Sequence, residues 1–443
     1  MSTEVANAAE TNAPLRFVTA ASLFDGHDAA INVMRRLIQA QGTEVVHLGH
    51  NRSVDDVVRA AIQEDADAIA MSSYQGGHVE YLKYMLELLK SHNAEHIQVF
   101  AGGGGTITLE EIDELQAAGV NRIYHPTDGM KLGLEGMIVD LVDRAGQQRV
   151  NTALPSAVDI NDEIAIAQTI SAIEEGVIDA QQLAELKQQW QQAAGATPVV
   201  GITGTGGAGK SSSVDELLGR FLQHRPEMRI AVLAVDPTRR RTGGALLGDR
   251  IRMNSLSAKN IYMRSMATRR QHLATSEMLG DVTLFLKSLG YDLVIVETAG
   301  IGQSDSEIVD LVDFSLYIMT SDYGAASQLE KIDMIDYADM VVLNKFDKRG
   351  AQDALRDIRK QWQRNHNRFD IEGEQIPVYP TIASQFNDPG VNWAYYNLTR
   401  LLVEKVGVDS ALWQPEAPTE ACEPNSVALI PGSRIRYLSE ISE

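Results

Sequence analysis

The feature that most constrains this chain is the run Gly204-Thr-Gly-Gly-Ala-Gly-Lys-Ser211, a complete GxxxxGK[ST] phosphate loop. An apolar run at 198–203 precedes it and a helical pattern at 213–222 follows it, which is the strand–loop–helix context that the motif requires. The glycines let successive backbone N–H groups converge on phosphate oxygens, and the helix N-terminus adds the positive end of its dipole. A Gly-rich turn with a chance lysine is the alternative. The context favours a site for a nucleoside triphosphate.

Individual residues of the loop have expected roles. Lys210 can reach the β- and γ-phosphates and stabilise the transition state of phosphoryl transfer, so it is a candidate catalytic residue. The hydroxyl of Ser211 is expected to bind Mg²⁺. We expect the other phosphate contacts from Gly206, Gly207, Ala208 and Gly209.

A second motif indicates which base is bound. An apolar strand pattern at 339–343 runs into Asn344-Lys345-Phe346-Asp347, an NKxD sequence. The Asp347 carboxylate can only accept hydrogen bonds, so it pairs with the ring N–H and amino group of guanine and opposes the ring nitrogen of adenine. Alone, NKxD is more often a strand-end turn, but downstream of a phosphate loop it is a strong signal. We therefore expect Asn344, Lys345 and Asp347 to bind GTP.

Acidic residues between these motifs suit Mg²⁺. The strand pattern that begins at Tyr291 ends on Glu297, and Thr-Ala-Gly follows. In nucleotide triphosphatases such an acid holds Mg²⁺, often through water, so Glu297 is the second candidate catalytic residue. Asp236 and Asp249 also have Mg²⁺-compatible chemistry, although a solvated loop carboxylate is the alternative for Asp249.

Arginines crowd the loop that contains Asp249, in a chain with only 39 basic residues and a formal net charge of −21. Anionic phosphates explain this local reversal of charge, and a solvated basic loop is the alternative. Among them we expect Arg252 to contact GTP. The five arginines are Arg239, Arg240, Arg241, Arg250 and Arg252.

The first 145 residues alternate short apolar strands with helical patterns, which predicts a parallel, doubly wound sheet of the flavodoxin-like kind. Ligands bind off the carboxyl ends of such strands. Unusual residues follow three of these ends: Asp25-Gly-His-Asp28, Ser72-Ser-Tyr-Gln-Gly-Gly77 and Gly102-Gly-Gly-Gly105. The expected strands are 16–21, 44–49, 68–73, 97–101 and 122–125, and the expected helices are 29–41, 54–64, 79–91, 109–118 and 129–144.

The D-x-H step lets Asp25 accept a hydrogen bond from one imidazole nitrogen of His27 and leaves the other nitrogen free for a metal. One histidine cannot make a structural zinc site, and the single cysteine, Cys422, is far away in sequence. A metal already held in a macrocycle fits better, and the glycine run would admit a bulky ligand close to the backbone. The alternatives without a ligand are an ordinary loop histidine and a Gly-rich turn. Three unusual ends on one sheet edge favour a ligand site.

These three strand ends resemble the cobalamin-binding domain of base-off, His-on mutases and methyltransferases. The resemblance implies that His27 is the lower cobalt ligand and that Asp25 is its hydrogen-bond partner. It also implies that Ser72, Gly104 and Gly105 line the channel for the displaced dimethylbenzimidazole tail. Ala30 and Tyr74 stand where the family usually has Gly and Leu, which changes the lining and not the ligand.

The second half resembles the G-protein chaperones of adenosylcobalamin mutases, through Val235–Thr238, Gly243–Arg250 and Glu297–Ser304. The resemblance implies that four residues bind Mg²⁺: Ser211, Asp236, Asp249 and Glu297. It also implies that Asp322–Lys331 is an additional switch loop that faces the partner.

The order of the two halves resembles the N-terminal part of the fused isobutyryl-CoA mutases, within the adenosylcobalamin-dependent acyl-CoA mutase family. The resemblance implies adenosylcobalamin, Mg²⁺ and GTP as cofactors, GTP hydrolysis that gates cofactor loading and protection, and a homodimer in the full-length protein. Rearrangement of isobutyryl-CoA to n-butyryl-CoA would need a CoA-binding barrel of roughly 250 residues, for which no space remains in this sequence. The alternative is a stand-alone GTPase chaperone that carries cobalamin to a separate mutase subunit.

We therefore expect a disordered 1–14, a cobalamin-binding domain at 15–148, a helical linker at 149–196, a P-loop GTPase domain at 197–410 and a C-terminal linker at 411–443. One cysteine provides no disulfide framework, and neither a signal peptide nor a spanning apolar run is evident, which favours the cytoplasm and no membrane association. The net charge of −21 opposes phosphate backbones, so nucleic-acid binding is not expected.

Overall fold

The computed structural model describes residues 13–150, 154–239, 241–268, 272–298, 308–323, 329, 332–419 and 421–424, with the backbone alone at 272–276 and 323. The chain divides into two compact units. One comprises Met1–Val200 with Glu227–Ala299, and the other comprises Gly201–Pro226 with Gly300–Glu443. Across the described residues, no helix combines the length and apolar character needed to cross a membrane.

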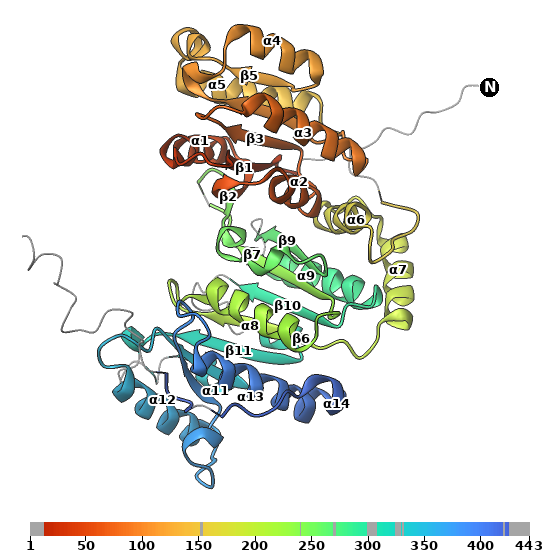
Figure 1. Cartoon of the computed structure of the whole chain (residues 1–443). Helices are drawn as coiled ribbons and strands as arrows, with labels where there is room; N and C mark the ends of the chain where they lie inside the picture. The colour runs from red at the N-terminus through yellow and green to blue at the C-terminus, as the bar shows by residue number, and fades with distance from the viewer. Residues whose placement is uncertain are drawn as a thin grey trace, which may run out of the picture. The chain divides into compact units, whose positions relative to one another are not determined.

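The first sheet is the flavodoxin-like sheet that the sequence predicts, with parallel strands in the order β5-β4-β3-β1-β2-β8. Figure 1 labels β5, β3, β1 and β2 of this sheet. Helices alternate with its first five strands, as a doubly wound fold requires. The strands are β1 (Arg16–Ser22), β2 (Glu44–Arg52), β3 (Ala68–Ser72), β4 (Gln98–Gly102) and β5 (Arg122–Tyr124). The helices are α1 (Asp28–Ala40), α2 (Val54–Gln63), α3 (His78–Ser91), α4 (Leu109–Ala118) and α5 (Pro126–Gln147).

Local sequence explains where these elements begin. Every residue of β3 is buried, as expected for a central parallel strand covered on both faces. Thr108 and Glu111 form a reciprocal capping box at the start of α4. Helix α5 begins three residues earlier than predicted, because His125 caps it and Pro126, with its fixed φ, occupies the first turn.

The second sheet carries the nucleotide motifs and runs in the order β13-β12-β11-β6-β10-β7-β9. Its strand β6 ends at the phosphate loop, and β12 ends at Asn344. The strands are β6 (Val199–Gly204), β7 (Ile230–Asp236), β9 (Ile261–Ala267), β10 (Leu293–Thr298), β11 (Phe314–Met319), β12 (Met340–Asn344) and β13 (Val378–Thr381). The helices are α8 (Lys210–His224), α9 (His272–Ser288), α11 (Met334–Tyr337), α12 (Ala351–Asn365), α13 (Pro389–Val406) and α14 (Ser410–Trp413).

Strand β8 (Ala245–Leu247) has a partner that the sequence does not predict. We expected residues 243–250 to belong to the nucleotide half, but β8 pairs in parallel with β2 and forms the edge of the first sheet. Two helices, α6 (Glu163–Glu175) and α7 (Ala180–Ala193), lie in the segment expected to be a linker. Most of α6 is buried, from Ala165 to Ile173 apart from Gln168, so this helix is part of the core of the first unit.

One buried histidine gives the first unit a pH dependence. His47 on β2 lies opposite Thr19 on β1, and its Nδ1 is 3.0 Å from the Thr19 hydroxyl oxygen. Burial, together with the charge of Arg35, lowers the pKa of His47 to about 4. The folded state therefore holds the neutral imidazole, and the associated stability is present above the unfolded-state pKa and is lost as the pH falls towards 4.

We predict that His47→Gln reduces the acid sensitivity of the first unit, because glutamine fits the site without titrating. The wild type should lose about 2 kcal/mol more stability than the variant between pH 7.5 and pH 5, from the difference between a folded pKa near 4 and an unfolded pKa near 6.5. Urea unfolding at both pH values measures this difference. The exposed His92→Gln serves as the control, and equal acid sensitivity in wild type and His47→Gln would refute the assignment.

Candidate functional site

The D-x-H step has the geometry that its sequence predicts. Asp25 and His27 lie in the loop between β1 and α1, and His27 Nδ1 is 2.8 Å from Asp25 Oδ1. The Asp25 carboxylate is fully buried, whereas the His27 side chain is 69% exposed. With Nδ1 held by the carboxylate, the exposed imidazole presents Nε2 as its second nitrogen, in the tautomer that a metal ligand requires.

Asp25 is held as an anion. Burial opposes its ionisation, but hydrogen bonds from the amides of Tyr74 and His27 and from the His27 ring outweigh burial and lower the pKa of Asp25. The amide of Tyr74 donates to Oδ2 at 2.7 Å, and the amide of His27 donates to Oδ1 at 2.9 Å. An ionised Asp25 favours the Nδ1–H tautomer of His27, which leaves the lone pair on Nε2.

An apolar cavity of about 320 Å³ opens along the same side of the sheet. The predicted residues Ser72 and Gly104 line it, but Gly105 is not among its lining residues. Tyr74 also lines it, and the Tyr74 ring centroid is 5.4 Å from that of His27. The sequence analysis missed a wall from α1, β4, β5 and α5, which includes Met34, Phe100, Tyr124, His125, Met137 and Leu141. Pro126 marks the start of α5, so this residue was the sequence signal that could have placed α5 beside the cavity.

Two glycines beside the cavity make close contacts with its neighbours. A Cβ on Gly103 would lie 1.9 Å from the carbonyl oxygen of Ser73, and one on Gly104 would lie 2.8 Å from the Tyr74 ring. Gly104 also has a φ of +59°, a conformation that favours glycine. A Cβ on Gly105 would meet nothing within 4 Å. The Tyr74 ring thus occupies the space that a side chain at position 104 would need, and Tyr74 is the residue that replaces the usual leucine.

The phosphate loop forms a cradle of backbone amides. Gly207 and Gly209 have φ values of +75° and +91°, and a Cβ on Gly206 or Gly207 would meet nothing within 4 Å, so the mouth of the loop is open. Lys210 donates from Nζ to the carbonyl oxygens of Gly204 and Thr205, at 3.0 and 3.4 Å. The buried Thr205 hydroxyl has no hydrogen-bond partner in the structure, as expected for a group that faces phosphate.

The NKxD motif supports this cradle directly. Asn344 donates from Nδ2 to the carbonyl oxygen of Ala208 at 2.8 Å, and Lys345 donates from Nζ to that of Gly207 at 2.7 Å. The buried Asn344 amide oxygen accepts from Thr381 and from the amide of Ala383. Asp347 is exposed just beyond these residues, where its carboxylate is open to a base.

Of the four predicted magnesium ligands, two lie on neighbouring strands of one sheet. Asp236 is the last residue of β7 and Glu297 is the next-to-last residue of the neighbouring parallel strand β10, whereas Ser211 belongs to the other unit. Asp249 begins the short helix η2 (Asp249–Arg252), where Arg252 Nη1 is 3.9 Å from it. No cluster of three or more His, Cys, Asp and Glu side chains suited to a metal occurs among the described residues. This donor set fits a Mg²⁺ that takes most of its ligands from phosphates and water.

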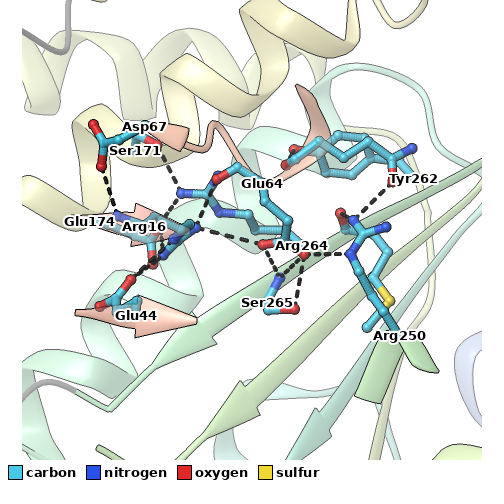
Figure 2. A network of polar contacts seen from close by, with 12 residues as sticks. Arg16, Glu44, Glu64, Asp67, Ser171, Glu174, Arg250, Tyr262, Arg264 and Ser265 are labelled. Atoms are coloured by element: carbon cyan, nitrogen blue, oxygen red, sulfur yellow. Dashed lines mark hydrogen bonds and ion pairs between the residues drawn. The ribbon is translucent and has the colours of Figure 1, made fainter. Parts of the chain in front are cut away.

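The structure corrects the prediction for Arg250 (Figure 2), whereas several other predicted residues fall outside the described ranges. Arg250, expected among arginines that face phosphate, is buried and pairs with Glu64 on the carboxyl side of α2. Arg240, residues 299–304 of the acidic motif and most of the switch loop Asp322–Lys331 lie outside the described residues.

Comparison with known proteins places both halves in families. Residues 166–410 match the methylmalonyl-CoA mutase-associated GTPase MeaB, and residues 15–128 match the B12 binding domain. The chain therefore belongs to the MeaB family of GTPases and carries a B12-binding domain ahead of the GTPase.

Curated relatives have the same two halves in one protein. A fused isobutyryl-CoA mutase from Cupriavidus metallidurans is 54% identical over 97% of this chain and 39% of its own length. Another from Geobacillus kaustophilus is 50% identical over 97% of this chain and 40% of its own length. The chain thus spans about two-fifths of these relatives, and the expected resemblance is confirmed. A solved LAO/AO transport system kinase matches 58% of this chain and 78% of its own, at 21% identity and a TM-score of 0.37.

We predict that Asn344→Ala weakens nucleotide binding although the side chain acts on the loop through Ala208. The substitution leaves buried donors and an acceptor unpaired and frees the loop, which should lower GDP affinity about 10- to 100-fold. Titration with a fluorescent GDP analogue measures the effect, and Asn365→Ala on α12 is the control, because that half-buried side chain bonds Gln361 and Asp336 and not the loop. Unchanged affinity in Asn344→Ala would contradict this supporting role.

Proposed function

We propose that this chain is the cobalamin- and GTP-binding portion of an acyl-CoA mutase, in which the GTPase gates loading and protection of the cofactor. The observation that carries the proposal is the Asp25–His27 pair beside an apolar cavity of about 320 Å³. The 97% coverage of this chain by fused isobutyryl-CoA mutases supports a partner domain in the same protein over a separate subunit.

The residues of the first unit suit a corrinoid whose own base is displaced. His27 would hold cobalt through Nε2, Asp25 would fix its tautomer, and Ser72 and Gly104 would lie along the displaced base. Adenosylcobalamin supplies radical chemistry when bound. The protein's own contribution is to hold Nδ1 of His27 on Asp25, so that Nε2 faces the metal, and to exclude water from the apolar cavity.

The phosphate loop and NKxD motif suit GTP hydrolysis. Lys210 would stabilise charge on the phosphates, Asp347 would select guanine, and Ser211 would bind Mg²⁺. Glu297, Asp236 and Asp249 would hold that ion through water, and Arg252 would neutralise phosphate charge.

The proposed reaction is the rearrangement of isobutyryl-CoA to n-butyryl-CoA, as the printed name of the relatives indicates for them. A CoA-binding barrel would supply the substrate site, and a homodimer in the cytoplasm would be the working assembly. The single cysteine of this chain suits a reducing compartment.

We predict that the chain binds cobalamin base-off with imidazole on cobalt, and that His27→Ala removes the cobalt–nitrogen bond. Electron paramagnetic resonance of the Co(II) form reports that nitrogen as a splitting of the signal. Lys210→Ala is the control, because its site is built from other residues and should leave the splitting intact. A splitting that survives in His27→Ala would overturn the ligand assignment.

We predict that Asp347→Asn lowers GTP affinity about 10- to 100-fold, because an amide replaces one acceptor by a donor opposite guanine. The same change should raise the affinity for XTP, whose base offers an acceptor there. Competition binding with GTP, XTP and ATP measures both effects. Asp353→Asn, an exposed residue of α12, provides the matched control, and an unaltered GTP preference in Asp347→Asn would rule out the motif.

A further inference from the structure

A buried histidine beside the cavity of the first unit is not used by the proposed function. His78 is the first residue of α3, and it closes the run Ser72-Ser-Tyr-Gln-Gly-Gly-His78 that begins at the end of β3. Its side chain is 6% exposed, whereas that of His27 is 69% exposed. A buried imidazole needs polar neighbours, because burying its nitrogens without them costs free energy. The neighbours of the two ring nitrogens therefore indicate what this residue does.

Both ring nitrogens of His78 face oxygen acceptors. Nδ1 lies 3.2 Å from the carbonyl oxygen of Gln75, in the loop that carries Tyr74. The buried Nε2 lies 3.2 Å from Oε2 of Glu111 on α4, without the alignment of a hydrogen bond. A carbonyl and a carboxylate can only accept, so each contact is attractive when the nitrogen that faces it carries a proton. His78 thus connects the loop after β3 to the helix that follows β4.

Glu111 is held from its other side by the loop after β4. The amide of Thr108 donates to Glu111 Oε2 at 2.7 Å, and the Thr108 hydroxyl donates to the same oxygen at 2.9 Å. These hydrogen bonds lower the pKa of Glu111, so the group beside His78 is ionised. The short helix η1 (Gly104–Thr106) ends two residues before Thr108. The contact of His78 therefore reaches the glycine run through a short, capped stretch of chain.

The same two loops also touch directly at the cavity. The amide of Ser73 donates to the carbonyl oxygen of Gly102 at 2.9 Å, and the Thr106 hydroxyl lies 3.5 Å from the carbonyl oxygen of Tyr74. A Cβ on Gly104 would lie 2.8 Å from the Tyr74 ring. Tyr74 and Gly104 both line the cavity of about 320 Å³. The spacing of the two loops therefore sets the width of the cavity between them.

We propose that His78 is a positioning residue for the nucleotide tail of cobalamin. By holding the loops after β3 and β4 together, it keeps the cavity at the width of the displaced base. Close packing matters for a flat base, because dispersion attraction falls steeply when a gap opens beside it. His78 is not among the residues that line the cavity, so it acts through Tyr74 and Gly104. This inference rests on the proposed function, because it requires the tail to occupy this cavity.

A histidine that only stabilises the fold is the alternative. Residues of α3 and α4, such as Leu82 and Ile112, belong to the core of the first unit, so loss of His78 would then lower stability as a whole. Such a loss would weaken the binding of every corrinoid alike. A positioning role is selective, because it affects only corrinoids that carry the nucleotide tail.

Calorimetric titration of the whole chain with adenosylcobalamin and with adenosylcobinamide, which lacks the nucleotide tail, separates the two roles. His78→Phe keeps a ring of similar size and removes both polar contacts, so it should lower adenosylcobalamin affinity about 10- to 100-fold and leave adenosylcobinamide affinity unchanged. His78→Gln places an amide nitrogen towards Glu111 and should restore most of the lost affinity. His92→Phe, at the exposed end of the same helix, is the matched control.

Glu111→Gln tests the other side of the contact. Glutamine can still cap α4 but removes the negative charge that faces His78, so the same tail-selective loss should appear in smaller measure. Glu110→Gln, the exposed neighbour on α4, is its control. If His78→Phe fails to fold, as shown by circular dichroism, Glu111→Gln decides: a loss for adenosylcobalamin alone supports the proposal, and unchanged affinity refutes it.

Equal losses for both corrinoids in a folded His78→Phe, or no loss for either, would overturn the positioning role. Where adenosylcobinamide binds too weakly to titrate, the Co(II) signal at saturating cobalamin decides. A weakened His78→Phe that keeps the cobalt–nitrogen splitting supports the proposal, because His27 is untouched, and a lost splitting refutes it. A wild type that binds both corrinoids equally tightly refutes this inference alone, whereas a wild type that binds neither refutes the proposed function.

Discussion

Both halves depend on one constraint, the parallel pairing of their strands. Within the described residues, the paired β-strands of both sheets run parallel. A parallel pair needs a crossover connection between its two strands. The carboxyl ends then gather along one edge, and the chain can place unusual residues there without disturbing the core. Asp25, Ser72 and Gly104 lie at three strand ends of one sheet, while the phosphate loop and NKxD motif lie at two ends of the other.

Local interactions were readable from the sequence. The Asp25–His27 contact spans two residues, so the spacing itself predicts the geometry found at 2.8 Å. Both nucleotide motifs were also predictable, because each is a short run at a strand end. Their mutual support through Asn344 and Ala208 spans 136 residues, but it follows from the neighbouring positions of β6 and β12 around β11 in the sheet.

Contacts between residues far apart in the chain could not be predicted from the sequence. The three residues of β8 have no strand-length apolar run, and their partner on β2 lies about two hundred positions earlier. In the sequence Arg250 is one of several loop arginines. Only the structure shows that it is buried and paired with Glu64, 186 residues away. Likewise, α6 has the Gln- and Glu-containing composition of a linker, and only the structure shows that most of its residues are buried. Such choices are made by tertiary packing, which a single sequence does not display.

The burial of α6 has a consequence for how this protein can be divided. A fragment that stops near residue 148, where the sequence suggests a domain end, would remove Glu174 from Arg16 and both Arg250 and Ser265 from Glu64. Its β2 would become an open sheet edge, with unpaired backbone groups available to other chains. The shortest piece that keeps the cobalamin sheet intact therefore extends through β9. In this protein the strand that completes the first sheet comes from inside the segment that matches the GTPase family.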